Sequence, residues 1–270
     1  MKRYYPTLLI TLALLASPAS HAHKRWFMPT DFTLSEAETV TVDFTASNNV
    51  FFVDSPMPLA SVEVISPAGA TMPLGQPYEG KRRSSFDIPV AATGTYRVTT
   101  AGPPMYFVSY LLPGETKPQG GRGKLAQLKA NVPTDATDVT FSEAKARIES
   151  FITLGGQTPL LVDENADGLQ IDFGNSHPNA LYSDEPANFS FLLNGEPIAG
   201  MDITVTAEGS RYRDEQEDRS YTTGEDGSVE IEWSQPGRYL LEASTAEPLT
   251  TGEISTRYYS YFLTVEVMAP

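Results

Sequence analysis

Short stretches in which apolar and polar residues alternate dominate the chain, as in strands that bury one face. In the first half, alternation runs through residues 39–44, 61–65 and 94–99, and turn clusters such as 66–69 separate these stretches. Side chains on a strand point alternately to its two faces, so each stretch can bury one row of apolar groups. The spacing predicts a first antiparallel β-sandwich over residues 23–113.

The same pattern returns in the last third of the chain. Residues 187–193, 201–206 and 259–267 alternate, and Asn194 with Gly195 forms a typical hairpin turn. These signals predict a second antiparallel sandwich over residues 168–270. The fold class expected is therefore all-β, with two β-sandwiches in tandem.

The turns of this second part resemble those of transthyretin-type and immunoglobulin-like modules of exported proteins. Residues 222–227 and 236–239 carry the resemblance. It implies a β-sandwich scaffold and names no reaction.

Residues 114–167 show no clear period. The segment 120–124 is rich in glycine and carries Arg122 and Lys124, which favours a surface linker. Residues 142–145 are compatible with a short helix, whereas residues 151–153 favour a strand, so both structures stay open for residues 142–154.

The first 22 residues have the pattern of a cleaved signal peptide. Lys2 and Arg3 precede an apolar run over residues 8–16, and Ser20 and Ala22 are the small residues that a signal peptidase reads. The run is too short to span a membrane. We therefore expect a periplasmic protein of a Gram-negative bacterium whose mature chain begins at His23 and does not span the membrane.

Composition excludes several classes of function. The formal net charge is −15, so nucleic acid is not an expected partner. The absence of cysteine excludes disulfides and thiolate metal sites. Hydrolytic chemistry has little support, because no G-x-S-x-G motif and no cysteine nucleophile is present.

The predicted cleavage leaves two histidines, His23 and His177. As the first residue, His23 would offer both its α-amine and its ring Nδ1 to one metal ion. If the two sandwiches meet, a nitrogen of His177 would complete a three-nitrogen set, called a histidine brace, which suits Cu(II) or Ni(II). The alternative is that His177 only caps the loop before Pro178 and that His23 is a frayed terminus.

Seven short motifs stand out along the mature chain: His23 with Trp26 and Pro29, and residues 47–52, 94–97, 176–179, 194–197, 211–214 and 259–261. In combination they resemble a family of exported bacterial proteins of unknown function that are described as nickel- or cobalt-uptake periplasmic components. The resemblance spans nearly all of residues 23–268. It implies a role in metal uptake and, by position, Asp54 as a carboxylate ligand. Members of this kind often carry a histidine after that aspartate, where this chain has Ser55.

Three further features have competing interpretations. Residues 163–168 match the opening of a calcium loop, but its twelfth position is Gly174 instead of glutamate, so calcium is not expected and an acidic turn is favoured. Met57, Met72 and Met105 each adjoin a proline, and they either bind Cu(I) or fill gaps in the sandwiches. Residues 211–218 form either a docking hairpin or a solvated strand with a charged turn.

These observations predict a non-enzymatic, divalent-metal-binding carrier or accessory of a nickel, cobalt or copper uptake system, with His23, His177 and Asp54 as ligands. Its expected partner is a metal transporter of the inner or outer membrane. An envelope interaction scaffold without a small ligand is the alternative. A copper oxidase or oxygenase built on the histidine brace is the third hypothesis.

Overall fold

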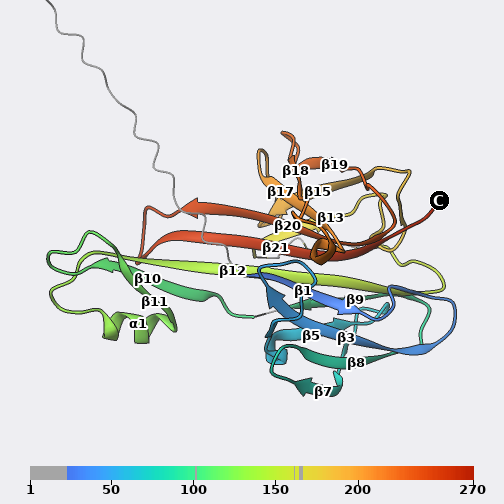
Figure 1. Ribbon diagram of the computed structural model, residues 1–270, viewed down its shortest axis with the longest axis horizontal. Coiled ribbons are helices and arrows are strands. Elements are labelled where there is room, and N and C mark those ends of the chain that lie inside the picture. The colour runs from blue at the N-terminus through green and yellow to red at the C-terminus, as the bar shows by residue number, and fades with distance from the viewer. Residues whose placement is uncertain (1–22, 101, 161, 164–166) are drawn as a thin grey trace, which may run out of the picture.

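A computed structural model describes residues 23–100, 102–160, 162–163 and 167–270 of the chain, and the predicted signal peptide lies outside this range. It confirms the all-β expectation: the regular structure of the described residues is three sheets, one short α-helix and two 3-10 turns. Figure 1 shows a long central sheet with a smaller sheet on either side of it.

Sheet A lies on one side of the central sheet. Its strands are β1 (Lys24–Pro29), β3 (Glu38–Ser47), β4 (Ser55–Pro56), β7 (Gly75–Glu79) and β8 (Ser84–Val90). Sheet C lies on the other side, with strands β13 (Leu169–Asp172), β15 (Ala187–Leu193), β16 (Glu196–Pro197) and β19 (Ser228–Ile231).

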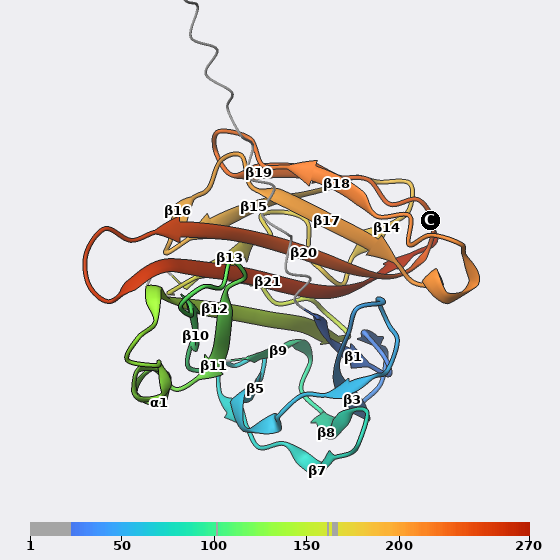
Figure 2. The same ribbon diagram turned by 60° about the vertical axis from the view of Figure 1, so that its left-hand side comes forward.

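Sheet B, the central sheet, has twelve strands. They are β2 (Thr33–Leu34), β5 (Val62–Ile65), β6 (Thr71–Met72), β9 (Gly94–Thr100), β10 (Met105–Leu111), β11 (Gln119–Gly123), β12 (Thr137–Leu154), β14 (Leu181–Tyr182), β17 (Asp202–Ala207), β18 (Arg219–Thr222), β20 (Gly237–Pro248) and β21 (Ile254–Met268). The helical elements are α1 (Leu125–Asn131) and the 3-10 turns η1 (Leu59–Ser61) and η2 (Ser210–Tyr212). Figure 2 shows β17, β20, β21 and β12 in succession across the sheet.

The two cores share sheet B, because successive side chains of a strand point to opposite faces. On β12, Ile152 belongs to the core with sheet A, and its neighbour Phe151 belongs to the core with sheet C. On β21, Phe262 and Leu263 divide in the same way. The two predicted sandwiches are therefore fused through one sheet.

Residues 114–167, for which the sequence predicted a linker with ambiguous short elements, hold two strands and the α-helix. This segment holds β12, the longest strand, which pairs antiparallel with β9 and parallel with β21. Residues 142–154 are thus strand, because the apolar residues at their end are buried on both faces of sheet B, and such burial overrides local propensity. The glycine-rich segment is the edge strand β11.

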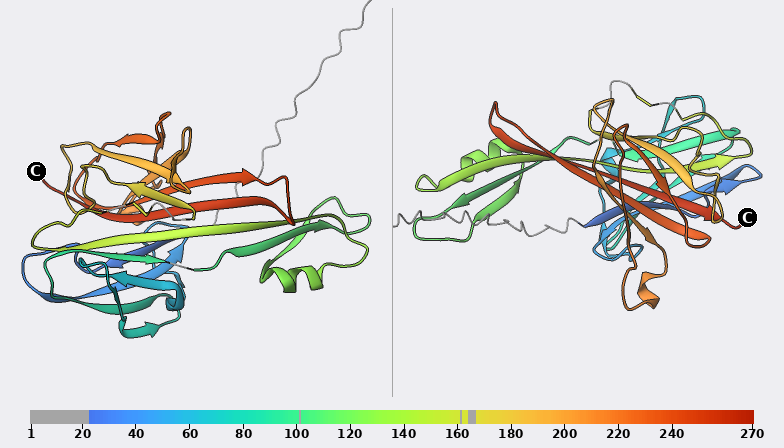
Figure 3. Two further views of the ribbon diagram at one scale, coloured as in Figure 1. Left: turned by 180° about the vertical axis from the view of Figure 1, so that it is seen from behind. Right: turned by 90° about the horizontal axis from the view of Figure 1, so that it is seen from above.

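Part of sheet B extends beyond both cores as an arm. It consists of β10, β11 and α1 with the adjoining parts of β12, β20 and β21, and it projects from the body in Figures 1 and 3. Among the described residues, no helix has the length and apolarity needed to cross a membrane.

Candidate functional site

His23 is exposed and immediately precedes β1. Its neighbour Lys24 is held in place: the Lys24 Nζ lies 3.2 Å from Gln216 Oε1 and 3.6 Å and 3.9 Å from carboxylate oxygens of Asp218 and Glu242. The Lys24 side chain is only 16% exposed. The residue that follows His23 is thus held by side-chain contacts, while His23 itself is exposed.

Two loops that are distant in the sequence meet beside the start of β1. The Gln216 amide donates to the Asn48 carbonyl at 3.3 Å, and the Ser210 hydroxyl donates to the Val50 carbonyl at 3.2 Å. The guanidinium of Arg211 lies 5.0 Å from the centre of the Phe52 ring. Three of the motifs that carried the family resemblance, at residues 23–29, 47–52 and 211–214, thus converge at one end of the molecule.

Asp54 lies at this same end. It is exposed and precedes β4, whose Ser55 pairs with Ala46, and Ala46 in turn pairs with Arg25 on β1. Both β1 and β4 therefore start at the same end of β3, with one strand between them. Neighbouring strands lie about 4.8 Å apart, which places the backbones at Asp54 and His23 roughly 10 Å from each other.

His177 occupies a different region. Its Nδ1 accepts the backbone N–H of Asn179 at 3.1 Å, so in the neutral ring Nε2 carries the proton and donates to Thr95 Oγ1, also at 3.1 Å. Burial lowers the pKa of His177, partly opposed by a hydrogen bond with the backbone of Thr158. Both ring nitrogens of the neutral histidine are thus occupied, as expected for a structural residue.

His23 and His177 do not converge. The Asn179 amide, next to His177, donates to the Phe32 carbonyl at 2.8 Å, and Phe32 lies beyond the far end of β1. The six residues of β1 alone span roughly 20 Å, whereas one metal ion needs its nitrogen ligands about 2 Å away. The predicted three-nitrogen brace of His23 and His177 is therefore wrong.

No group of three or more histidine, aspartate or glutamate side chains is arranged to hold a metal among the described residues. In the predicted calcium loop, residues 164–166 lie outside the described part, while Asp167 forms an ion pair with Lys145. Met57 and Met72 pack against the core with sheet A, and Met105 is 47% exposed on β10. Residues 210–212 form the turn η2, so the predicted strand at 211–213 is wrong.

A buried ionic network on sheet B was missed by the sequence reasoning. Glu149 on β12 is 1% exposed; one of its carboxylate oxygens accepts from Arg97 and from Thr99 Oγ1, and the other accepts from the Tyr261 hydroxyl. Burial disfavours the Arg97 cation, but the Glu149 carboxylate outweighs this effect and raises the Arg97 pKa. Burial, followed by the charge of Glu149, raises the Tyr261 pKa well above its ordinary value.

A sequence signal for this network existed. Arg97 and Tyr261 both fall within motifs that carried the family resemblance, and Glu149 stands next to the apolar end of β12. What the sequence did not reveal is that β9, β12 and β21 are neighbours, because their order in the sheet follows from pairing over long sequence separations.

Comparison with known proteins gives a family but no activity. The family model described as "Domain of unknown function (DUF4198)" matches residues 20–247. No curated protein matches the chain.

Several solved structures are similar at low identity. The D0-D1 domain of intimin covers 90% of this chain and 97% of its own length at 10% identity, with a TM-score of 0.23. The FN1-FN3 domains of chicken CNTN1 cover 90% and 98% at 9% identity, with a TM-score of 0.24. A Salmonella alpha-2-macroglobulin mutant covers 96% of this chain at 14% identity and a TM-score of 0.24, over only 16% of its own length.

Proposed function

Since the chain belongs to the DUF4198 family, whose description assigns no reaction, we propose a function from its own residues. The protein is exported to the periplasm and binds a divalent transition-metal ion, nickel, cobalt or copper, through His23. It acts there as a carrier or accessory of a metal-uptake system, next to a membrane transporter. This role is not enzymatic.

The observation that carries the proposal is the fixed position of the chain beside His23. Cleavage after Ala22 would create an α-amine directly next to Lys24, whose ammonium contacts Gln216, Asp218 and Glu242. The amine and the ring Nδ1 of His23 would form a two-nitrogen chelate on a backbone that is already ordered, which reduces the entropy lost on binding.

A carboxylate is available at the same end of the molecule. Asp54 is exposed, and its position relative to His23 permits a third ligand if the loop over residues 48–54 moves by a few ångströms. His177 is removed from the ligand set, because its ring nitrogens hydrogen-bond to Asn179 and Thr95. Binding weakens as the pH falls, since protons compete for the imidazole and the amine.

The test is calorimetric titration of the mature chain beginning at His23 with Cu(II), Ni(II) and Co(II) separately. We expect saturable binding of one ion per chain that His23→Ala abolishes. Acetylation of the α-amine at mildly acidic pH, where lysines stay protonated, should abolish it too. Asp54→Asn should weaken binding several-fold, while the matched change Asp31→Asn, at the other end of β1, leaves it unchanged. Equal binding by wild type and His23→Ala would overturn the proposal.

A second candidate function, an interaction scaffold of the envelope, is favoured by one observation. Tyr212 on η2 is 84% exposed next to Arg211, at the same end of the molecule. Tyrosine and arginine are typical of binding hot spots between proteins. For a scaffold, Tyr212→Ala would abolish function in cells while His23→Ala preserves it; the metal carrier predicts the reverse.

A further inference from the structure

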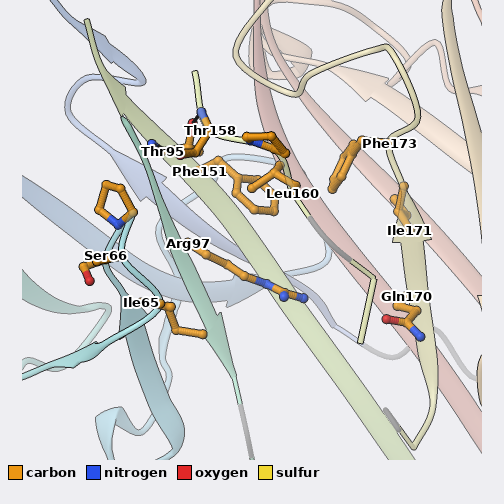
Figure 4. A pocket seen from close by; sticks show the side chains of 14 residues that line it. Ile65, Ser66, Thr95, Arg97, Phe151, Thr158, Leu160, Gln170, Ile171 and Phe173 are labelled. Atoms are coloured by element: carbon orange, nitrogen blue, oxygen red, sulfur yellow. Dashed lines mark hydrogen bonds between the residues drawn. The ribbon is translucent and has the colours of Figure 1, made fainter. Parts of the chain in front are cut away.

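A cavity of about 380 Å³ lies where the two halves of the molecule meet on the sheet C side of sheet B. Figure 4 shows the side chains that line it, with Arg97 reaching across the cavity toward Gln170. The first half contributes Arg97 and the turn after β5, and the second half contributes residues 158–160 and β13 with the adjoining Phe173. The cavity is called the Arg97 pocket below.

One wall of the Arg97 pocket is apolar. Phe151, Leu160 and Phe173 lie together in Figure 4, and the rings of Phe151 and Phe173 meet edge to face with centroids 5.3 Å apart. Ile65 and Ile171 add aliphatic surface on the two sides. Pockets of this size that combine apolar walls with a few polar groups to orient the ligand are typical of small-molecule sites.

The polar side of the pocket has one charged group. Among its lining residues in the described ranges, Arg97 alone is ionic. Its Nε and Nη2 donate to Glu149, at 2.7 Å and 2.5 Å, which leaves Nη1 outside these two bonds. The side-chain amide of Gln170 forms two hydrogen bonds with the backbone of Asp163, which hold it in place. Arg97 is therefore the donor that a ligand in the pocket would meet.

The charge balance defines the head group of the ligand. Glu149 pairs with Arg97 and also lies 3.8 Å from Arg147, while the charge of Asp163 acts on Arg97 as well, so two carboxylates face these two cations. An added carboxylate would therefore gain little net attraction and would approach buried negative charge. An uncharged oxygen acceptor would use the remaining N–H without that cost. We propose that the Arg97 pocket binds a small amphipathic molecule: an apolar chain against Phe151, Leu160 and Phe173, and a neutral carbonyl head, as in an amide or ester, on Arg97.

Three probes with the same chain and different heads test this proposal by calorimetry on the full mature protein: octanamide, octanoate and octylammonium. We expect saturable binding of octanamide, at least tenfold weaker binding of octanoate and none of octylammonium. Equal affinity for the three heads, tighter binding of octanoate, or no binding of octanamide would each overturn it.

Two variants locate the site. Leu160→Trp places a larger side chain in the pocket from a half-buried loop position and should lower octanamide affinity at least tenfold. Leu249→Trp, at another half-buried loop leucine that does not line the pocket, is the matched control and should leave affinity unchanged. Arg97→Lys keeps the charge opposite Glu149 and should remove the preference for octanamide over octanoate. Equal affinity of wild type and Leu160→Trp would overturn the assignment.

Discussion

Arg97 donates two hydrogen bonds to a single carboxylate oxygen of Glu149, at 2.7 Å and 2.5 Å. The Arg97 side chain is 24% exposed and that of Glu149 is 1% exposed, so the carboxylate depends on protein partners instead of water. The pair joins β9 to β12, and the Tyr261 hydroxyl connects both to β21.

Removing the charge of Glu149 should therefore be costly. Glu149→Gln removes the carboxylate that Arg97 and Arg147 both contact, and breaking such a buried pair costs about 3 kcal/mol of unfolding free energy. Urea denaturation measures the effect. Glu230→Gln, an exposed change on β19, is the control and should stay within about 0.5 kcal/mol of wild type.

Asn179 joins the two halves near His177. Its Nδ2 donates to the Phe32 carbonyl at 2.8 Å and to Thr153 Oγ1 at 3.0 Å, and the side chain is buried. Asn179→Ala leaves a buried carbonyl without this donor, so we expect a loss of about 2 kcal/mol in denaturant unfolding. Asn188→Ala, whose side chain is exposed, should cost much less. Similar losses for the two variants would contradict the structural role of Asn179.

The lowered pKa of His177 predicts a specific pH dependence. A histidine whose pKa is depressed by folding contributes stability that is complete above about pH 6.5 and is lost as the pH falls through the folded-state pKa. Wild type should therefore lose more unfolding free energy than His177→Gln between pH 7.5 and pH 5.5. His23 is present in both proteins, so its contribution cancels. An equal loss would show that His177 is not buried in its neutral form.

The contacts of Lys24 predict order at the start of β1. Lys24→Met removes the ammonium that Gln216, Asp218 and Glu242 surround, and hydrogen exchange of the Arg25 and Trp26 amides should accelerate. The loss of overall stability should be about 1 kcal/mol or less, because such part-exposed ion pairs are weak. Lys81→Met, at an exposed site, should leave exchange in β1 unchanged.

The shared sheet predicts that the two cores unfold together. Trp26 lies in the core with sheet A and Trp233 in the core with sheet C, so Trp233→Phe and Trp26→Phe each leave one fluorescent reporter. In both backgrounds the fluorescence midpoint in urea should coincide with that of circular dichroism. Leu263→Ala, a truncation in the core with sheet C, should shift both reporters by about 3 kcal/mol. A shift confined to Trp233 would indicate two independent domains.

The alternation of apolar and polar residues was sufficient to locate most strands, because a strand that buries one face has an apolar residue at every second position. Asn194 and Gly195 both adopt positive φ, as their hairpin turn requires, and the apolar residues of the alternating stretches fill the two cores. The prediction failed for β12, and the reason lies in its sequence. β12 carries polar residues such as Asp138 and Thr140 where it pairs with β10 in the arm, and apolar residues over the cores, so its period changes along its length.

At the candidate site, too, the sequence revealed the types of the residues but not their positions relative to one another. The sequence singled out His23, His177 and Asp54 by residue type, but their separation depends on the direction of β1 and on the parallel pairing of β12 with β21. Such pairing over more than a hundred residues leaves no local signal. His177 drew attention as a scarce residue, whereas Thr95, Asn179 and Thr158, which explain its role, are of ordinary types.

Because the two halves share sheet B, the core with sheet A can close only late in the synthesis of the chain. Leu240 and Phe262, close to the carboxyl end, fill part of the core that the first ninety residues build with sheet A. The strands of sheet A are therefore synthesised first, but their apolar surface is fully covered only after β20 and β21 have been synthesised. A chain released by a ribosome that stalls before β20 would lack these side chains. The apolar surface of its core with sheet A would stay exposed to solvent, and chaperones and proteases capture chains of this kind.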